Sequence, residues 1–258
     1  MCSYFFEGNH LYRIKASQKI ALFLDFDGTL VPIQKDPSKC FLSEDIKKQL
    51  KLLAHSKNIY LTIISGRSLS DIKKRVGLRK ICYGGNHGFD ISCPSLRYTH
   101  PKALSAKPII NHVKQQLQKE IKNIKGAFLE DKGYSLSLHF RSVKEEYIHP
   151  LKIIFYKKVK GFLKKKLLTV MRGKMVLELI PDASWNKGKA VLYILRRLGK
   201  DYLPIYIGDD QTDETAFETL KKSGITIQVG KSKKTSARYY LKDYREVSQL
   251  LQQIQQWH

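Results

Sequence analysis

The sequence predicts an α/β protein, with a doubly wound parallel sheet and a smaller α+β domain inserted into the chain. Apolar runs of strand length, such as residues 20–24 and 59–64, alternate with amphipathic stretches of helix length. A strand that is apolar throughout is buried on both faces, which is typical of a parallel sheet covered by helices. Further along the chain this alternation stops, and later it resumes. We therefore expect a Rossmann-like core built from residues 1–99 and 182–258, with the α+β domain at residues 100–181.

The first half of the chain contains the clearest core elements. Ser43 is an expected helix N-cap, because two acids follow it in the first turn and apolar residues then recur on one helical face. A short helix is expected to end near Gly77, since glycine commonly closes a helix. In chain order we expect strands at residues 20–24, 59–64 and 81–83, a helix after Ser43, and a short helix over about residues 69–76.

Three prolines, Pro94, Pro101 and Pro108, mark the start of the inserted domain. Alternating apolar residues at Leu136 and Leu138 predict a strand with one buried face. The expected elements of this domain are a helix at about residues 109–124, strands at 128–130 and 134–140, a basic helix, and strands at 167–170 and 175–180.

The chain then returns to the core pattern. Apolar residues from Val191 to Leu198 form one stripe of a helix that Gly199 closes. Thr212 is an expected N-cap of the next helix. The remaining expected elements are strands at residues 203–207 and 225–229, a helix after Thr212 that ends at Gly224, and an amphipathic helix at the C-terminal end.

The net charge is strongly positive, at +24 for 258 residues, although an apolar fraction of 42% and a charged fraction of 27% are ordinary for a globular protein. The densest basic segment, residues 157–174, contains no acid. Nucleic-acid binding is one explanation of such a charge. We favour a lysine-rich solvated surface, because the charge is spread along the chain and no nucleic-acid-binding motif is present. A field that attracts anionic substrates is a third explanation.

No apolar run approaches the roughly 20 residues that a membrane helix needs, and the N-terminal segment lacks the apolar stretch of a signal peptide. We therefore expect a cytoplasmic monomer with no membrane contact. The four cysteines, Cys2, Cys40, Cys82 and Cys93, form no CxxC pair. In a long chain without a secretory signal this favours free thiols over disulfides, and no Cys/His spacing supports a zinc site.

Two acidic clusters each follow an expected buried strand. Residues 25–30 are Asp-Phe-Asp-Gly-Thr-Leu, and residues 208–214 are Gly-Asp-Asp-Gln-Thr-Asp-Glu. The first cluster places one carboxylate to attack and a second to move a proton, beside a backbone that can approach an anion. Carboxylate oxygens are ligands that Mg²⁺ prefers. Together the two clusters predict a magnesium site built from both halves of the chain.

Four short motifs occur along the chain, each at an expected strand end or helix start. They are Asp25-x-Asp27-Gly-Thr-Leu, Ser65-Gly-Arg, a lysine that opens a helix at Lys187, and Gly208-Asp209-Asp210-x-x-Asp213. In this order they resemble the motifs of the haloacid dehalogenase superfamily of phosphohydrolases, and chance is a poor explanation for all four. The resemblance implies a hydrolase core, with the inserted domain as its cap.

From about residue 19 onward the chain also resembles the trehalose-phosphate phosphatase branch of that superfamily. The similar segments are residues 25–33, 85–88, 130–141, 173–178 and 185–188. Two positions depart from the pattern of this branch. Phe140 stands where tyrosine is usual, and Ile180 stands where a basic residue is common. The second departure bears on how that edge of the cap meets its ligand.

The resemblance implies catalytic roles for Asp25, Asp27 and Lys187. Asp25 is the implied nucleophile that forms an aspartyl-phosphate, and as an ordinary carboxylate with a pKa of about 3.9 it is expected to be anionic at neutral pH. Asp27 is implied to protonate the leaving sugar oxygen and then to deprotonate water, so it must be protonated when substrate binds. Ser65, the amide of Gly66 and Lys187 are the implied phosphate-binding groups.

Mg²⁺ is the implied cofactor. Its implied ligands are Asp25, the backbone carbonyl of Asp27 and Asp209, and its charge offsets the repulsion between carboxylate and phosphate. Asp210 and Asp213 are implied to orient the phosphate-binding lysine or a water molecule. An ordinary first-turn helix acid is an alternative for Asp213.

The resemblance implies that the cap recognises a sugar, and carboxylates can accept hydrogen bonds from pairs of sugar hydroxyls. The candidate sugar-binding residues are Glu130, Lys132, Glu178, Lys174, Arg141 and His87, with Asn86 beside the last of them. An ordinary polar group at a strand edge or in a loop is the alternative for each. The implied reaction is Mg²⁺-dependent hydrolysis of trehalose 6-phosphate to trehalose and phosphate. A same-fold phosphatase for sucrose phosphate or a glycosyl phosphoglycerate stays open, as does a basic nucleic-acid-binding protein with a vestigial site.

Overall fold

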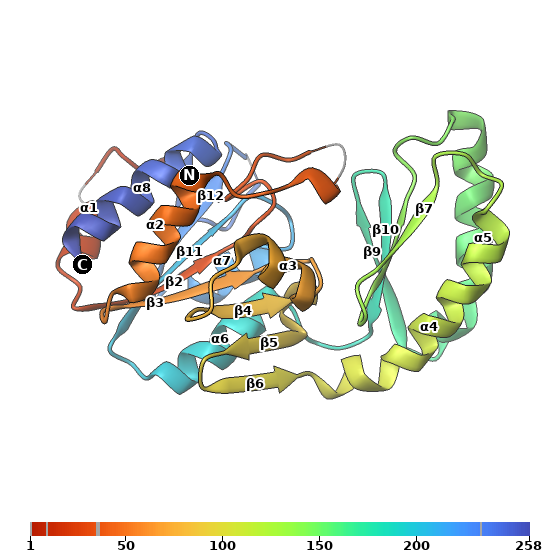
Figure 1. Ribbon diagram of the computed structural model, residues 1–258, viewed down its shortest axis with the longest axis horizontal. Coiled ribbons are helices and arrows are strands. Elements are labelled where there is room, and N and C mark those ends of the chain that lie inside the picture. Colours follow the sequence, from red (N-terminus) through yellow and green to blue (C-terminus); the bar gives the residue numbers. More distant parts are fainter. Residues whose placement is uncertain (1, 9, 35–36, 233) are drawn as a thin grey trace. The chain divides into compact units, whose positions relative to one another are not determined.

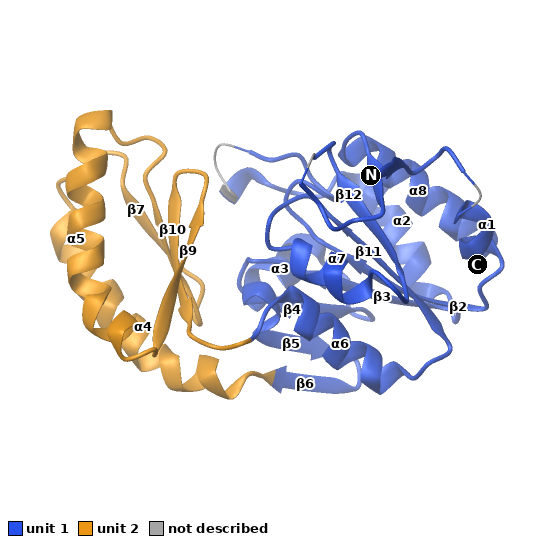
Figure 2. Cartoon of the chain, turned by 180° about the vertical axis from the view of Figure 1, so that it is seen from behind, with its two compact units in different colours: residues 1–98, 185–258 blue, residues 99–184 orange. Residues whose placement is uncertain are grey.

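The computed structural model describes residues 2–8, 10–34, 37–232 and 234–258. The chain divides into two compact units. Unit 1 comprises Met1–Tyr98 and Trp185–His258, and unit 2 comprises Thr99–Ser184. Figure 2 shows unit 1 in blue and unit 2 in orange. Each unit has a hydrophobic core of its own.

Unit 1 is built around a nine-stranded sheet with the order β1-β13-β12-β11-β2-β3-β4-β5-β6 (Figure 1). In that order, neighbouring strands are parallel from β1 through β4, and β5 pairs antiparallel with β4. The strands are β1 (Ser3–Tyr4), β2 (Lys19–Leu24), β3 (Ile59–Ile64), β4 (Cys82–Gly85), β5 (Asp90–Cys93), β6 (Leu96–Thr99), β11 (Tyr202–Gly208), β12 (Ile225–Val229) and β13 (Tyr239–Leu241).

Helices cover both faces of this sheet. Strand β2 alternates between the two cores, with Leu22 and Leu24 in the cluster that includes α2, α3 and α8, and with Ala21 and Phe23 in the cluster that includes α6 and α7. The helices of unit 1 are α1 (His10–Lys15), α2 (Glu44–His55), α3 (Leu69–Val76), α6 (Lys187–Leu198), α7 (Glu214–Leu220) and α8 (Tyr244–Trp257). The predicted α/β class with a doubly wound sheet is confirmed, and the antiparallel strand β5 extends it.

Several local predictions in unit 1 are confirmed. Strands β3 and β12 and helix α3 have the predicted bounds. Ser43 is the N-cap of α2, and its side chain accepts a hydrogen bond from the amide of Ile46. Gly77 ends α3 with a φ of 71°, a left-handed conformation that glycine adopts at little cost.

The predicted start and end of α7 are wrong. Asp213, and not Thr212, occupies the N-cap position, and the hydroxyl of Thr212 donates to Asp210 Oδ1 at 2.6 Å. The helix ends at Leu220, so Gly224 lies beyond it. Threonine and aspartate both favour N-caps, and the sequence does not show which of two adjacent candidates takes that position.

The prediction of four free thiols is also wrong, because Cys82 and Cys93 form a disulfide. Tyr83 pairs with Ser92 across β4 and β5, which places the two cysteines opposite each other on neighbouring strands. The sequence analysis did not find β5, so nothing indicated that these cysteines meet. Cys2 and Cys40 are free thiols.

Unit 2 is a four-stranded antiparallel sheet with two helices, in the order β7-β8-β10-β9. Its elements are α4 (Pro101–Ile121), β7 (Phe128–Asp131), β8 (Leu136–His139), α5 (Glu145–Lys164), β9 (Leu168–Gly173) and β10 (Val176–Pro181). Helix α4 starts at Pro101, about two turns before the predicted start, because proline is well accepted in a first helical turn. Across the described residues, no helix has the length and apolarity that crossing a membrane requires.

Candidate active site

Two neighbouring strands bring the two acidic clusters together. Strands β2 and β11 pair with Leu24 beside Ile207, and the amide of Asp25 donates to the carbonyl oxygen of Ile207 at 2.9 Å. Asp25 and Asp209 therefore follow adjacent strands at the same edge of the sheet. Strand β3 lies on the other side of β2 and is followed by Ser65. The carboxyl ends of three parallel strands thus collect the candidate residues.

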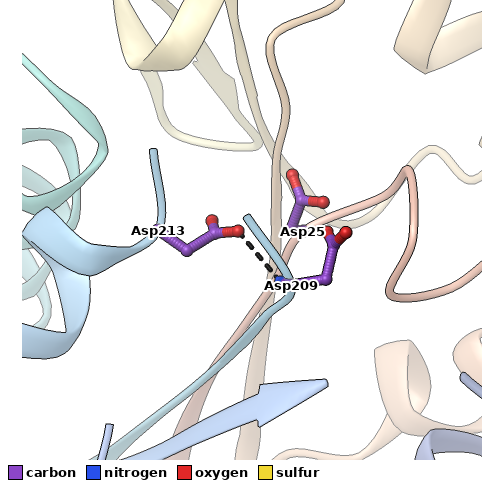
Figure 3. A group of neighbouring side chains, drawn as sticks. All are labelled: Asp25, Asp209 and Asp213. Carbon is purple, nitrogen blue, oxygen red and sulfur yellow. Dashed lines mark hydrogen bonds between the residues drawn. The ribbon is translucent and has the colours of Figure 1, made fainter. Parts of the chain in front are cut away.

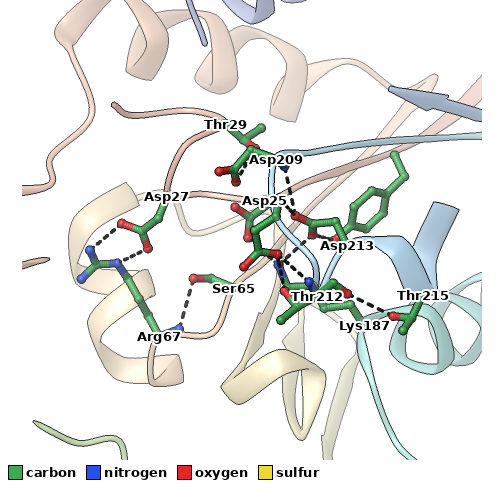
Figure 4. A network of polar contacts seen from close by, with 12 residues as sticks. Asp25, Asp27, Thr29, Ser65, Arg67, Lys187, Asp209, Thr212, Asp213 and Thr215 are labelled. Carbon is green, nitrogen blue, oxygen red and sulfur yellow. Dashed lines mark hydrogen bonds and ion pairs between the residues drawn. The ribbon is translucent and has the colours of Figure 1, made fainter. Parts of the chain in front are cut away.

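Lys187 is a buried cation at this edge, with 2% of its surface exposed. It is the first residue of α6, and the side chain of the N-cap residue Asn186 accepts a backbone amide hydrogen bond. The ammonium donates to Asp25 Oδ1 at 2.8 Å and to Asp213 Oδ1 at 2.7 Å (Figure 4). It also lies 3.9 Å from Asp210 Oδ1. One ammonium therefore links the two acidic clusters.

Asp213 is fully buried and organises the second cluster. Its Oδ1 accepts from Lys187 and from the hydroxyl of Tyr206 at 2.6 Å. Its Oδ2 accepts from the amides of Asp209 at 3.0 Å and Asp210 at 3.1 Å. An ordinary acid in the first turn of a helix does not accept hydrogen bonds from four donors. The alternative that Asp213 is such an acid is therefore wrong. The sequence analysis did not predict Tyr206 as part of this group, because in the sequence it is only one residue of an expected apolar strand.

The carboxylates outnumber the ammonium in this group, and their pKa values reflect it. Burial raises the pKa of Asp25 well above its ordinary value, although Lys187 opposes the shift. Burial also raises the pKa of Asp213 and that of Asp209, the latter to about 7. Burial alone would lower the pKa of Lys187, but Asp213 and Asp25 outweigh it and raise that pKa. Lys187 is therefore charged, and a single positive charge does not neutralise the three carboxylates of Asp25, Asp209 and Asp213, of which Asp209 is half-buried.

This charge excess corrects one expectation about Asp25. An ordinary carboxylate would be fully ionised at neutral pH, but the burial of Asp25 opposes its ionisation when no metal is bound. Asp210 behaves differently. Burial opposes its charge, but Lys187 and the hydrogen bond from Thr212 outweigh burial and lower the pKa of Asp210 to about 2.

The acidic group fits a divalent cation. Asp25, Asp209 and Asp213 each offer a carboxylate oxygen, and these oxygens lie within 4.8 Å of one another (Figure 3). Hard oxygen donors suit Mg²⁺, whose charge would relieve the carboxylate excess. Because Asp213 already accepts four hydrogen bonds, Asp25 and Asp209 are the better-placed metal ligands. The backbone carbonyl of Asp27 stays a predicted ligand.

Gly28 lets the backbone approach this group closely. A Cβ atom at this position would lie 2.0 Å from Asp209 Oδ2, and the φ of Gly28 is +89°. Residues with a side chain rarely adopt that backbone angle, and no side chain at this position would fit against the carboxylate of Asp209. The glycine after the first acidic pair is therefore required by the geometry of the second cluster.

Asp27 has a different partner from Asp25. Its carboxylate accepts from Arg67 Nη2 at 2.6 Å and from Arg67 Nε at 2.7 Å (Figure 4). Arg67 also donates to Asp71 Oδ2 at 3.0 Å. Both oxygens of this carboxylate therefore accept from Arg67, whereas the implied role of Asp27 requires it to pass a proton to the leaving oxygen. The sequence contained Arg67 in the Ser-Gly-Arg motif but gave no sign of which acid it meets.

Ser65 and Gly66 form the turn after β3. The hydroxyl oxygen of Ser65 accepts from the amide of Arg67 at 3.1 Å. A Cβ atom at Gly66 would lie 2.6 Å from the imidazole Cε1 of His87, so a side chain there would displace this ring. The amide of His87 donates to the carbonyl oxygen of Ser65 at 2.9 Å. Asn86 and His87 therefore lie beside the predicted phosphate turn in unit 1, whereas the other sugar candidates belong to unit 2.

Three of the sugar candidates lie together in unit 2. Lys132 Nζ is 3.0 Å from Glu178 Oε1, and the hydroxyl of Ser135 donates to the same oxygen at 2.7 Å. Glu130 Oε2 is 2.8 Å from His139 Nε2. Burial works against ionisation of Glu130, but His139 and Lys132 outweigh it and lower the pKa of this carboxyl. Ser135 and His139 were not predicted as members of this group.

The two remaining candidates lie elsewhere in unit 2. Arg141 Nη2 donates to the carbonyl oxygen of Lys174 at 3.2 Å, and both residues are exposed. Lys174 lies in the hairpin between β9 and β10, away from the strand position of Glu178. These two residues therefore mark the hairpin rather than the group around Glu178.

The chain is similar to known proteins along most of its length. The family model described as Trehalose-phosphatase matches residues 23–245. Trehalose-phosphate phosphatase B of Arabidopsis thaliana is 35% identical over 256 residues, which cover 93% of this chain and 67% of that protein. Trehalose 6-phosphate phosphatase RA3 of Zea mays is 36% identical over 258 residues, covering 92% of this chain and 70% of that protein.

Solved structures share the fold. The C-terminal domain of trehalose-6-phosphate phosphatase from C. albicans has a TM-score of 0.83 at 23% identity, covering 99% of this chain and 98% of that one. At this identity the likeness shows the fold alone. Trehalose-6-phosphate phosphatase of Aspergillus fumigatus has a TM-score of 0.66 at 27% identity, covering 99% of both chains.

Proposed function

This chain belongs to the trehalose-phosphatase family of phosphoric monoester hydrolases, and on that premise we propose that it hydrolyses trehalose 6-phosphate to trehalose and phosphate with Mg²⁺ as cofactor. The observation that carries the proposal is the buried ion-paired group at the edge of the unit 1 sheet. It combines a candidate nucleophile, Asp25, with a phosphate-binding cation, Lys187, and a candidate metal ligand, Asp209.

The proposed reaction has two displacements at phosphorus. A carboxylate oxygen of Asp25 attacks, the bond between phosphorus and the sugar oxygen breaks, and that oxygen takes a proton from Asp27. Water then attacks the phosphorus of the aspartyl-phosphate and gives a proton to Asp27. The bond between phosphorus and the Asp25 oxygen breaks, so phosphate is released and the Asp25 carboxylate is regenerated. Lys187 and the turn at Ser65 and Gly66 hold the phosphate oxygens during both steps.

Asp27 must change partners for this sequence to run. Both of its carboxylate oxygens accept hydrogen bonds from Arg67 in this structure. We propose that substrate binding releases at least one of them, so that Asp27 can carry the proton to the leaving oxygen.

Bound Mg²⁺ would supply positive charge that offsets the repulsion between the phosphate and the carboxylates. Asp25, Asp209 and the backbone carbonyl of Asp27 are the proposed ligands. Asp213 and Asp210 are proposed to hold Lys187 and the second acidic loop in place, which the contacts of Asp213 support.

Unit 2 is the proposed cap, with Glu130, Lys132 and Glu178 as its sugar-binding residues. This assignment is supported by the hydrogen bonds and ion pairs that these residues form on one face of the unit 2 sheet. Arg141, Lys174 and His87 stay candidate sugar ligands. The cytoplasmic location, the monomeric state and the lack of nucleic-acid binding also stay predictions.

A substrate panel tests this function. Phosphate release should be fastest from trehalose 6-phosphate, compared with sucrose 6-phosphate and glucose 6-phosphate, and a chelator should abolish it until Mg²⁺ is added back. A preference for another ester would keep the reaction centre and replace the proposed sugar. No hydrolysis of any ester by folded protein, together with salt-sensitive DNA binding, would favour the nucleic-acid-binding alternative.

The raised pKa of Asp209, about 7, predicts how stability depends on pH and metal. Between about pH 4 and pH 7 the folded metal-free protein binds more protons at Asp209 than the unfolded chain does, so the free energy of unfolding falls as pH rises through this window. Mg²⁺ requires the ionised carboxylate. We therefore expect Mg²⁺, at about a hundredfold above its Kd, to raise the melting temperature by about 5–10 °C near pH 8 and by much less near pH 5.

Thermal unfolding with chelator and with Mg²⁺ at the two pH values measures this effect. Asp209→Asn should remove most of the Mg²⁺ shift, whereas Asp201→Asn, at an exposed position in a turn, should retain it. An equal shift at both pH values would mean that Asp209 does not titrate with metal binding.

A further inference from the structure

The unit 2 sheet has one apolar and one polar face. Helices α4 and α5 lie along the first, where Leu138 and Leu177 belong to the hydrophobic core (Figure 1). Side chains alternate along a strand, so the neighbouring residues Ser137 and Glu178 belong to the opposite face. Strand pairing places Ser137 directly between Glu130 and Glu178. This row of three polar residues is the centre of the polar face.

An aromatic pair forms the next row of the same face. Strand pairing places His139 between Phe128 and Val176. The rings of Phe128 and His139 are stacked, with centroids 4.5 Å apart and an interplanar angle of 8°. His139 Nε2 is bound to Glu130 Oε2, so the carboxylate fixes the imidazole and the imidazole supports the phenyl ring. Phe128 is nevertheless 50% exposed, which leaves part of its surface accessible.

The hydroxyl of Ser137 points to a ligand independently of the aromatic pair. Ser137 is fully buried, and its Oγ has no hydrogen-bond partner among the described residues. A buried hydroxyl without a hydrogen-bond partner lowers the stability of the fold by about 1–3 kcal/mol, so such groups are rare in proteins. Its position between Glu130 and Glu178 places an unused polar group in the middle of the carboxylate row.

These features together match a pyranose ring. Such a ring has a face of C–H groups, which packs on an aromatic ring, and a rim of hydroxyls, which donate to carboxylates and exchange hydrogen bonds with a serine. We propose that Phe128, supported by His139, packs against the C–H face of a glucose ring of the substrate. The hydroxyl of Ser137 forms a hydrogen bond with a hydroxyl of the same ring. The inference rests on the proposed function, because it takes the sugar ring from trehalose 6-phosphate.

The test compares Phe128 variants on two substrates. Phe128→Ala should lower kcat/KM for trehalose 6-phosphate by about tenfold to a hundredfold through a higher KM, since the lost contact serves binding before and during the reaction alike. Hydrolysis of a small aryl phosphate, which has no sugar ring, should change less than about twofold. Phe128→Trp should retain most of the preference, whereas Phe128→Leu should lose most of it, because leucine is apolar but not flat.

Tyr147→Ala is the matched control, because Tyr147 is also an aromatic residue of unit 2 and is also 50% exposed, but lies on helix α5. It should leave both activities unchanged. Glu130→Ala is the comparison for a carboxylate of the row and should also impair the sugar phosphate selectively. Unchanged KM in Phe128→Ala, or equal losses on both substrates, would overturn the proposed subsite.

The wild-type enzyme distinguishes failure of this subsite from failure of the proposed function. A wild-type preference for trehalose 6-phosphate over the aryl ester supports the function whatever the Phe128 variants do. If the wild type prefers another sugar phosphate, the proposed function fails and the same variants are compared on that ester. If it prefers no sugar phosphate at all, the subsite is overturned as well.

Discussion

Replacing Asp25 with asparagine is expected to lower phosphate release by at least about 10⁴-fold, because the amide does not form the bond to phosphorus. The substitution keeps the size of the side chain at the end of β2, and the new amide oxygen can still accept from Lys187, which lies 2.8 Å from Asp25 Oδ1. Phosphate release at saturating trehalose 6-phosphate and Mg²⁺ measures the loss. Substrate affinity should change far less than turnover, since Lys187 and the turn after β3 are unchanged.

The stability of the same variant separates a chemical from a structural role. Burial raises the pKa of Asp25, which means that its charge is unfavourable where it lies. Removing that charge should leave the melting temperature of the metal-free protein at or above the wild-type value. Asp201→Asn, at an exposed position, should retain full activity. Full turnover by Asp25→Asn would remove Asp25 as the nucleophile, and an unfolded variant would show that its carboxylate is needed for folding.

The sequence predicted the centre of the fold better than its margins. Strand β3 and strand β12 are continuous apolar runs, so their periodicity and length identify them without tertiary information. Strand β1 is different, because Ser3 and Tyr4 become a strand only by pairing with Tyr239 and Tyr240, more than 230 residues away. Short edge strands of this kind carry little local signal, since their pairing partners and not their composition define them.

The candidate site shows the same division. Asp25, Asp209 and Lys187 were predicted as site residues because each belongs to a short motif at a strand end or helix start, and the structure brings them together. Their partners were not found, because contacts between distant segments decide them. Tyr206 donates to Asp213 from within an apolar strand, and Arg67 meets Asp27 across 40 residues of sequence. The charged residues of the site could therefore be predicted from the sequence, whereas their hydrogen-bond partners could be identified only from the structure.

Removing the buried ammonium should damage both stability and activity. In Lys187→Met the carboxylates of Asp25 and Asp213 lose the cation that lies 2.8 and 2.7 Å from them. Breaking a buried ion pair by removing one partner typically costs about 3–5 kcal/mol, because the remaining charge has no compensation. Turnover should fall by at least about 10²–10³-fold, since a preorganised positive charge facing the phosphate is lost. Urea unfolding and initial rates of phosphate release measure the two effects.

The pH dependence of this loss tests its electrostatic origin. Without Lys187, the pKa values of Asp25 and Asp213 should rise further in the folded variant, so the folded state binds more protons than the unfolded chain and the variant becomes more stable as pH falls. Adding Asp213→Asn to Lys187→Met removes one uncompensated charge, so the double variant should regain stability but not activity. Arg196→Met, which removes an exposed positive charge from the same helix, should change neither property by more than about 0.5 kcal/mol or twofold. A Lys187→Met variant whose instability is the same at all pH values would show that the lysine stabilises the fold by packing its side chain and not by its charge.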